Sequence, residues 1–122
     1  MKVPAFILKR LYIKGSLRNT PEGCEFKLKN TLGSGYAIGL LPVTVDETLI
    51  AQDHAFYTVD GKRVMFTAVT KESPATLAMN REATITLHGH TLQPGPHKVF
   101  MGFKVTGLGD LTFDLLDTLT EG

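Results

Sequence analysis

Cysteine is almost absent from this sequence, because Cys24 is the only one among 122 residues. A single cysteine excludes an intrachain disulfide and a zinc site built from several cysteines. Phe26 and Leu28 follow Cys24 at spacing two, so we expect the thiol to pack as a small hydrophobic group. A reducing, cytoplasmic compartment is therefore the predicted location.

Long apolar runs and blocks of like charge are also missing. No stretch approaches the roughly 18 apolar residues of a membrane-spanning helix, and the apolar run in residues 1–10 is too short for a signal peptide. The 13 Lys and Arg residues nearly balance the 12 Asp and Glu residues, and both signs are interspersed. Nucleic-acid binders need a clustered basic surface, so we predict neither a nucleic-acid nor a membrane partner.

Helical periodicity is lacking too, whereas alternation of apolar and polar residues recurs along the chain. Alternating segments at residues 24–29, 83–87, 98–105 and 111–115 predict strands, and residues 10–17 are expected to form a hairpin with the first of them. Asp60 and Gly61 predict a tight hairpin turn. We expect one all-β domain over residues 1–122, a two-layer antiparallel sandwich of immunoglobulin-like or jelly-roll-like type with about seven to nine strands. Residues 75–81 could form a single helical turn.

His88 and His90 are the first candidates for chemistry. On a strand, residues two apart point to the same face and could share a metal ion, with His54 and Asp53 completing the ligands. This arrangement would suit a small cupin-like metal- or ligand-binding β-barrel. No carboxylate follows His90 until Asp110, however, so two exposed polar residues at a strand end are the favoured interpretation.

A second motif surrounds His97. Its pattern is typical of a structural corner, in which the ring hydrogen-bonds to the backbone and fixes a crossover between strands. The corner consists of Leu92, Pro94, Gly95 and His97.

Residues 36–41 are apolar at nearly every position, unlike the alternating segments. Such a strand is covered on both faces, either inside the domain or by a partner chain. Tyr36, Ile38 and Leu40 are expected to share one face, and the other three the opposite face. The candidate interface consists of Tyr36, Ala37, Ile38, Gly39, Leu40 and Leu41.

Taken together, the chain resembles the small β-sandwich subunits of C-glycoside deglycosidases. The likeness lies in residues 23–28, 35–36, 43–46 and 59–61, and in the corner of Leu92, Pro94, Gly95 and His97. It implies a non-catalytic β subunit without catalytic residues or cofactors of its own. A sugar-isomerase-like barrel subunit would carry the divalent metal and cleave a carbon–carbon bond between an oxidised sugar and its aglycone.

Similar short chains also carry a hydroxymethylglutaryl-CoA reductase label. This sequence has no dinucleotide fingerprint, and 122 residues are few to surround both a nicotinamide cofactor and a CoA thioester. We therefore expect no such reductase activity from the chain alone. Three hypotheses remain: an accessory subunit of a lyase complex, a metal- or ligand-binding barrel, and a self-associating structural domain.

Overall fold

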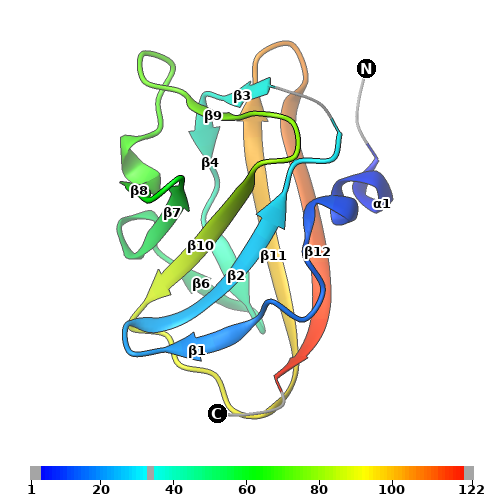
Figure 1. Ribbon diagram of the computed structural model, residues 1–122, viewed down its shortest axis with the longest axis vertical. Coiled ribbons are helices and arrows are strands. Elements are labelled where there is room, and N and C mark those ends of the chain that lie inside the picture. The colour runs from blue at the N-terminus through cyan, green and yellow to red at the C-terminus, as the bar shows by residue number, and fades with distance from the viewer. Residues whose placement is uncertain (1–3, 33–34, 120–122) are drawn as a thin grey trace.

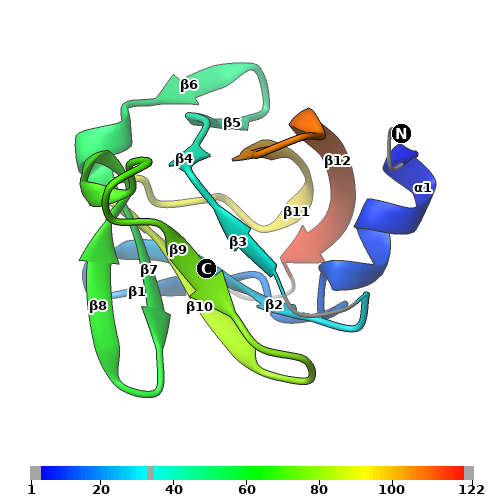
Figure 2. The same ribbon diagram turned by 90° about the horizontal axis from the view of Figure 1, so that it is seen from above.

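The computed structural model describes residues 4–32 and 35–119, and its two five-stranded antiparallel sheets face each other (Figure 1, Figure 2). The first sheet has the order β1-β2-β10-β7-β8. Its strands are β1 (Arg18–Thr20), β2 (Gly23–Lys29), β7 (Ala55–Val59), β8 (Lys62–Met65) and β10 (Glu82–His88). The all-β fold predicted from the alternation is confirmed.

The second sheet has the order β12-β11-β5-β6, and β4 pairs with β11 beside this path. Its strands are β4 (Gly39–Leu40), β5 (Val43–Val45), β6 (Thr48–Ile50), β11 (Gly95–Val105) and β12 (Gly109–Leu119). The two longest strands of this sheet, β11 and β12, form a hairpin in which Gly95 stands opposite Leu119 and Val105 opposite Gly109. A separate two-stranded ladder joins β3 (Gly35–Ala37) to β9 (Ala75–Leu77).

Four short helical segments accompany the strands: α1 (Ala5–Leu8) and the 3₁₀ turns η1 (Lys9–Leu11), η2 (Gln52–His54) and η3 (Phe66–Ala68). The first two lie against β12 and bury Leu8 and Leu11 in the core (Figure 1). No helix of the described chain is long and apolar enough to cross a membrane.

The core forms between the inner faces of the two sheets. In β2, Cys24, Phe26 and Leu28 are buried while the residues between them are more exposed. Val99 of β11 and Phe113 of β12 approach from the second sheet and are also buried. Because side chains alternate along a strand, a shift of one residue would move this whole set to the solvent face, so the apolar pattern fixes the register.

The predicted tight turn is confirmed. Asp60 and Gly61 both have positive φ, at 52° and 80°, and connect β7 to β8 in a two-residue hairpin. A two-residue turn with positive φ at both positions matches the right-handed twist of the strands that it joins. Glycine adopts positive φ without steric cost.

Several local predictions are wrong. The described chain has twelve strands rather than seven to nine, since several are only two or three residues long. Residues 10–17 do not form a strand of the first hairpin, whose partner for β2 is β1. Residues 75–81 contain strand β9 rather than a helical turn.

Candidate functional site

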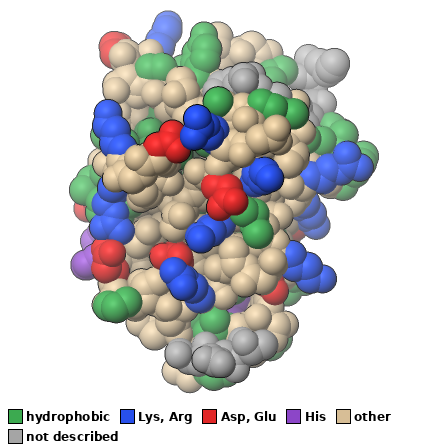
Figure 3. Space-filling model, viewed as in Figure 1, with side chains coloured by type: hydrophobic (Ala, Val, Ile, Leu, Met, Phe, Trp, Pro, Cys, Tyr) green, Lys and Arg blue, Asp and Glu red, His purple; other side chains and the backbone are tan. Residues whose placement is uncertain are grey.

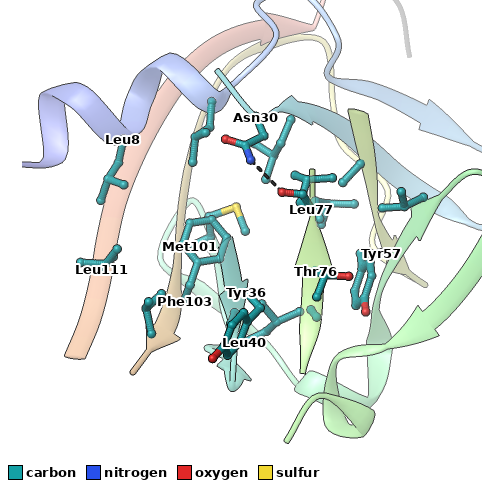
Figure 4. A pocket seen from close by; sticks show the side chains of 18 of the residues that line it. Leu8, Asn30, Tyr36, Leu40, Tyr57, Thr76, Leu77, Met101, Phe103 and Leu111 are labelled. Carbon is teal, nitrogen blue, oxygen red and sulfur yellow. Dashed lines mark hydrogen bonds between the residues drawn. The ribbon is translucent and has the colours of Figure 1, made fainter. Parts of the chain in front are cut away.

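A cavity of about 370 Å³ lies between the two sheets, beneath the β3–β9 ladder (Figure 4). Both sheets contribute to its wall, through Leu28 and Ile85 on one side and Met101 and Phe103 on the other. Leu8 and Leu11 close the side next to β12. Since Leu32, Tyr36 and Thr76 line the cavity and are exposed, its mouth lies where these three residues meet solvent.

Four polar side chains interrupt this apolar wall: those of Asn30, Tyr36, Tyr57 and Thr76. Asn30 is buried and has a structural role, because its Nδ2 donates a hydrogen bond to the carbonyl oxygen of Leu77 at 2.8 Å. Tyr36 stands opposite Thr76 in the β3–β9 ladder at the mouth. Tyr57 is half-buried, and burial raises the pKa of its phenol, so the hydroxyl stays protonated at physiological pH.

The candidate interface at residues 36–41 is not one strand. β3 pairs with β9, whereas β4 pairs with β11, and the chain bends at Ile38 between the two ladders. Alternation is lost at this bend, so Tyr36 is 55% exposed while Ala37 and Leu40 are both buried. The prediction that Tyr36, Ile38 and Leu40 share one face is therefore wrong, and Ala37 and Leu40 line the cavity.

Three residues of this segment are half-buried and lie alongside β11: Ile38, Gly39 and Leu41. Ile38 N–H donates to the carbonyl of Lys104, and Leu41 N–H donates to the carbonyl of Gly102. The Leu41 side chain lies over Gly102, since a Cβ placed on Gly102 would come within 2.8 Å of Leu41 Cδ1. Gly102 thus makes room for Leu41 on the outer side of the second sheet.

Exposed apolar side chains continue across that outer side. Leu49 is 66% exposed, Phe100 41% and Leu116 70%. Thr44 stands between Phe100 and Leu49 in the ladder, and Leu116 lies on β12 diagonally next to Phe100. We call this surface, made of Leu41, Leu49, Phe100 and Leu116, the outer apolar face.

Ion pairs lie within and beside the outer apolar face, because Asp114 stands opposite Phe100 and Lys98 opposite Leu116 in the β11–β12 ladder. Asp114 binds Lys9 at 3.3 Å and Lys98 at 3.5 Å, and Lys104 binds Asp110 at 3.5 Å. On the opposite side of the molecule, charged side chains of both signs spread over the face formed by β1, β2 and β10 (Figure 3).

The candidate metal ligands are not gathered into one site. β10 ends at His88, and Gly89 has a φ of +78°, so His88 and His90 do not share a strand face as expected. His54 lies 3.8 Å from Asp53, and its ring centroid lies 6.4 Å from that of His88. Within residues 4–32 and 35–119, no group of three or more His, Cys, Asp or Glu side chains could hold a metal ion.

His97 of the predicted corner is buried at the start of β11. Its Nδ1 lies 2.5 Å from Asp46 Oδ2, and its Nε2 lies 2.6 Å from the carbonyl oxygen of Gln93. A carboxylate and a carbonyl both accept hydrogen bonds, so a ring that donates to both carries a proton on each nitrogen and is positively charged. The hydrogen bonds to Asp46 and Gln93 raise the pKa of His97.

Asp46 is a hydrogen-bond partner of His97 that the sequence did not predict. Its other carboxylate oxygen accepts a hydrogen bond from the Lys98 N–H at 2.9 Å. Burial tends to raise the pKa of Asp46, but the bonds from His97 and Lys98 outweigh this effect and lower it. The other corner residues are also placed: Leu92 is buried and exchanges two hydrogen bonds with Asn19, and Pro94 precedes Gly95, where β11 begins.

Residues 7–120 match the family described as hydroxymethylglutaryl-CoA reductase, N-terminal domain. The chain belongs to this family. No curated protein matches the sequence.

The residues that match the hydroxymethylglutaryl-CoA reductase N-terminal domain family include those of the cavity and of the outer apolar face. The cavity is lined by residues between Leu8 and Leu111, and the outer apolar face lies between Leu41 and Leu116. Both therefore lie within the matched residues.

Proposed function

We propose that this member of the hydroxymethylglutaryl-CoA reductase N-terminal domain family is a non-catalytic accessory subunit of a metal-dependent, C-glycoside deglycosidase-like lyase complex. A sugar-isomerase-like barrel subunit would carry the catalytic residues and the divalent metal. The observation that carries the proposal is the outer apolar face. It offers a partner chain three exposed large apolar side chains on one side of the second sheet, those of Leu49, Phe100 and Leu116.

The composition of the outer apolar face suits a protein interface. Leu49, Phe100 and Leu116 expose apolar surface there, and the Lys98–Asp114 ion pair lies between Phe100 and Leu116. Stable interfaces bury large apolar side chains such as these together with polar groups. Burying a leucine or phenylalanine side chain contributes about 1.5–3 kcal/mol, so covering these three would supply a substantial part of an association free energy.

The family description gives separate support. It refers to the N-terminal domain of an enzyme, which fits a domain that works beside a separate catalytic part. The reductase reaction itself does not suit the cavity of this chain. A CoA thioester carries phosphates, and none of the described residues that line the cavity is charged. Burying phosphate charge without a partner is strongly unfavourable.

The proposal is tested by purifying the tagged chain from its native host and identifying the co-purified proteins by mass spectrometry. We expect a barrel-type, metal-dependent subunit in a fixed molar ratio with the wild type. Leu116→Lys should lose this subunit, because a lysine would place an unpaired charge in the interface. Met65→Lys is the matched control, since Met65 is an exposed apolar residue on the other sheet, at 37% exposure.

The accessory-subunit proposal and self-association of the chain predict different results. A wild-type chain that co-purifies with no other protein would contradict the accessory-subunit proposal, as would full retention of the partner by Leu116→Lys. A homo-oligomer of the purified chain that Leu116→Lys dissociates would assign the outer apolar face to self-association instead.

A further inference from the structure

We infer that the cavity between the sheets binds an uncharged, largely apolar small molecule that carries one hydroxyl or carbonyl group. This inference does not rest on the proposed accessory role, because the cavity faces inward and the outer apolar face lies on the far side of the second sheet. The chemistry of its wall and its polar groups determines the class of ligand.

The size of the cavity is the first argument. Native cores are packed as densely as organic crystals and contain few voids larger than a water molecule. This cavity has a volume of about 370 Å³, far more than one water molecule, and it opens to solvent at Leu32, Tyr36 and Thr76. It falls within the range of small-molecule pockets, roughly 300–1,000 Å³.

The wall limits the charge of the ligand. Leu, Ile, Val, Phe, Met and Ala side chains make up most of the lining, and among the described lining residues none is Lys, Arg, His, Asp or Glu. An ionised ligand group would have to leave water without an opposite charge to pair with, which is strongly unfavourable. A neutral ligand with a large apolar surface meets no such cost.

Tyr57 supplies a hydrogen-bonding group inside this wall. No other described residue is hydrogen-bonded to its hydroxyl, and its pKa is raised by burial, which keeps it a neutral donor. Asn30, by contrast, is already bonded to the carbonyl of Leu77. A ligand hydroxyl or carbonyl near Tyr57 could therefore accept its hydrogen bond while the rest of the molecule contacts the apolar wall (Figure 4).

Ala75 offers a direct way to fill the cavity. It stands opposite Ala37 in the β3–β9 ladder, and both residues line the cavity. A phenylalanine at position 75 would occupy ligand volume without removing any polar group. Ala51 is the matched control, because it is exposed, precedes η2 and does not line the cavity.

The test is a fluorescence titration of the isolated chain with N-phenyl-1-naphthylamine, an uncharged apolar probe. We expect saturable binding to the wild type, at least tenfold weaker binding to Ala75→Phe, and unchanged binding to Ala51→Phe. Leu116→Lys should also bind as the wild type does, which separates the cavity from the outer apolar face. Circular dichroism confirms that each variant is folded, and Ala75→Leu replaces Ala75→Phe if the latter does not fold.

Competition with three naphthalene derivatives tests the ligand class. We expect 2-naphthol to displace the probe, naphthalene to displace it more weakly, and the anionic 2-naphthoate to displace it least. Tyr57→Phe should weaken 2-naphthol by about two- to tenfold, the effect of one hydrogen bond, and leave naphthalene unchanged. Absence of saturable probe binding, wild-type binding by a folded cavity-filling variant, or equal displacement by 2-naphthoate and 2-naphthol would overturn the inference.

Discussion

Replacing His97 by alanine removes the group that joins three parts of the chain at one end of the sandwich. The ring bonds Asp46 in the turn between β5 and β6 and the carbonyl of Gln93 before β11. In the variant, the Gln93 carbonyl and Asp46 Oδ2 lose their donor, while Asp46 Oδ1 keeps the hydrogen bond from the Lys98 N–H. We expect the free energy of unfolding to fall.

The size of this fall follows from the burial of each partner. The Asp46 side chain is 45% exposed, so water can replace the ring there, and the ion pair itself contributes at most about 1 kcal/mol. The His97 side chain is only 10% exposed, so removing it leaves an empty volume, and the carbonyl of Gln93, an exposed residue, loses a hydrogen bond. A hydrogen bond typically contributes about 0.5–1.5 kcal/mol, so with the ion pair we expect a total loss of about 1–2 kcal/mol.

The loss should depend on pH with a definite sign. The pKa of His97 is raised in the folded state, so its charged form stabilises the fold fully below the ordinary value of 6.5, and this contribution disappears as pH rises through the raised pKa. The pKa of Asp46 is lowered, so its contribution is present above 3.8 and disappears as pH falls through the lowered pKa. The stabilisation is therefore greatest between about pH 4 and 6.5.

Urea unfolding of the wild type and His97→Ala at pH 5.5 and pH 9 measures this effect. The difference in unfolding free energy should be larger at pH 5.5, because the charged ring that donates both hydrogen bonds is lost as pH rises through the raised pKa of His97. Asp46→Asn is the companion variant and should reduce the pH dependence. An equal difference at both pH values, or no loss of stability in His97→Ala, would refute the assignment of a charged ring.

Three further substitutions test the fold, each by thermal denaturation followed by circular dichroism. Gly23→Ala should destabilise the protein by more than about 2 kcal/mol, because the new Cβ would lie 2.2 Å from the carbonyl oxygen of Leu87 at a φ of +153°; wild-type stability would contradict this close approach. Gly61→Val should cost at least about 1–2 kcal/mol, since valine would be forced to a φ of +80° in the hairpin turn; an unchanged melting temperature would contradict the turn geometry. Ala37→Glu should unfold the chain, because Ala37 is 9% exposed within the core and an unpaired carboxylate there costs several kcal/mol; a folded variant would place Ala37 outside the core.

The sequence pattern correctly predicted those features of the fold that depend on residues close together in the chain. Alternation around Cys24 predicted β2, and the requirement for positive φ at Asp60 and Gly61 predicted the β7–β8 turn. Both follow from neighbouring residues alone. The all-β class follows for the same reason, since several segments repeat this pattern.

Features made by distant segments could not be predicted in this way. The bend at Ile38 arises because the chain stops pairing with β9 and starts pairing with β11. An uninterrupted apolar run does not indicate where a strand changes its partner. Asp46 meets His97 across 51 positions, and its neighbours resemble any strand end. The cavity is lined by residues of both sheets and of α1 and η1, so its existence depends on the packing of the whole sandwich.

The central claim, that the outer apolar face binds a partner subunit, is tested most directly by thiol labelling at position 116. Cys24 is fully buried and burial raises the pKa of its thiol to about 11, so the native cysteine should react slowly. A maleimide should label Leu116→Cys rapidly in the isolated chain and slowly in the assembly purified from the native host. Met65→Cys should be labelled equally fast in both. Equal labelling of Leu116→Cys in the free chain and in the assembly would contradict the account.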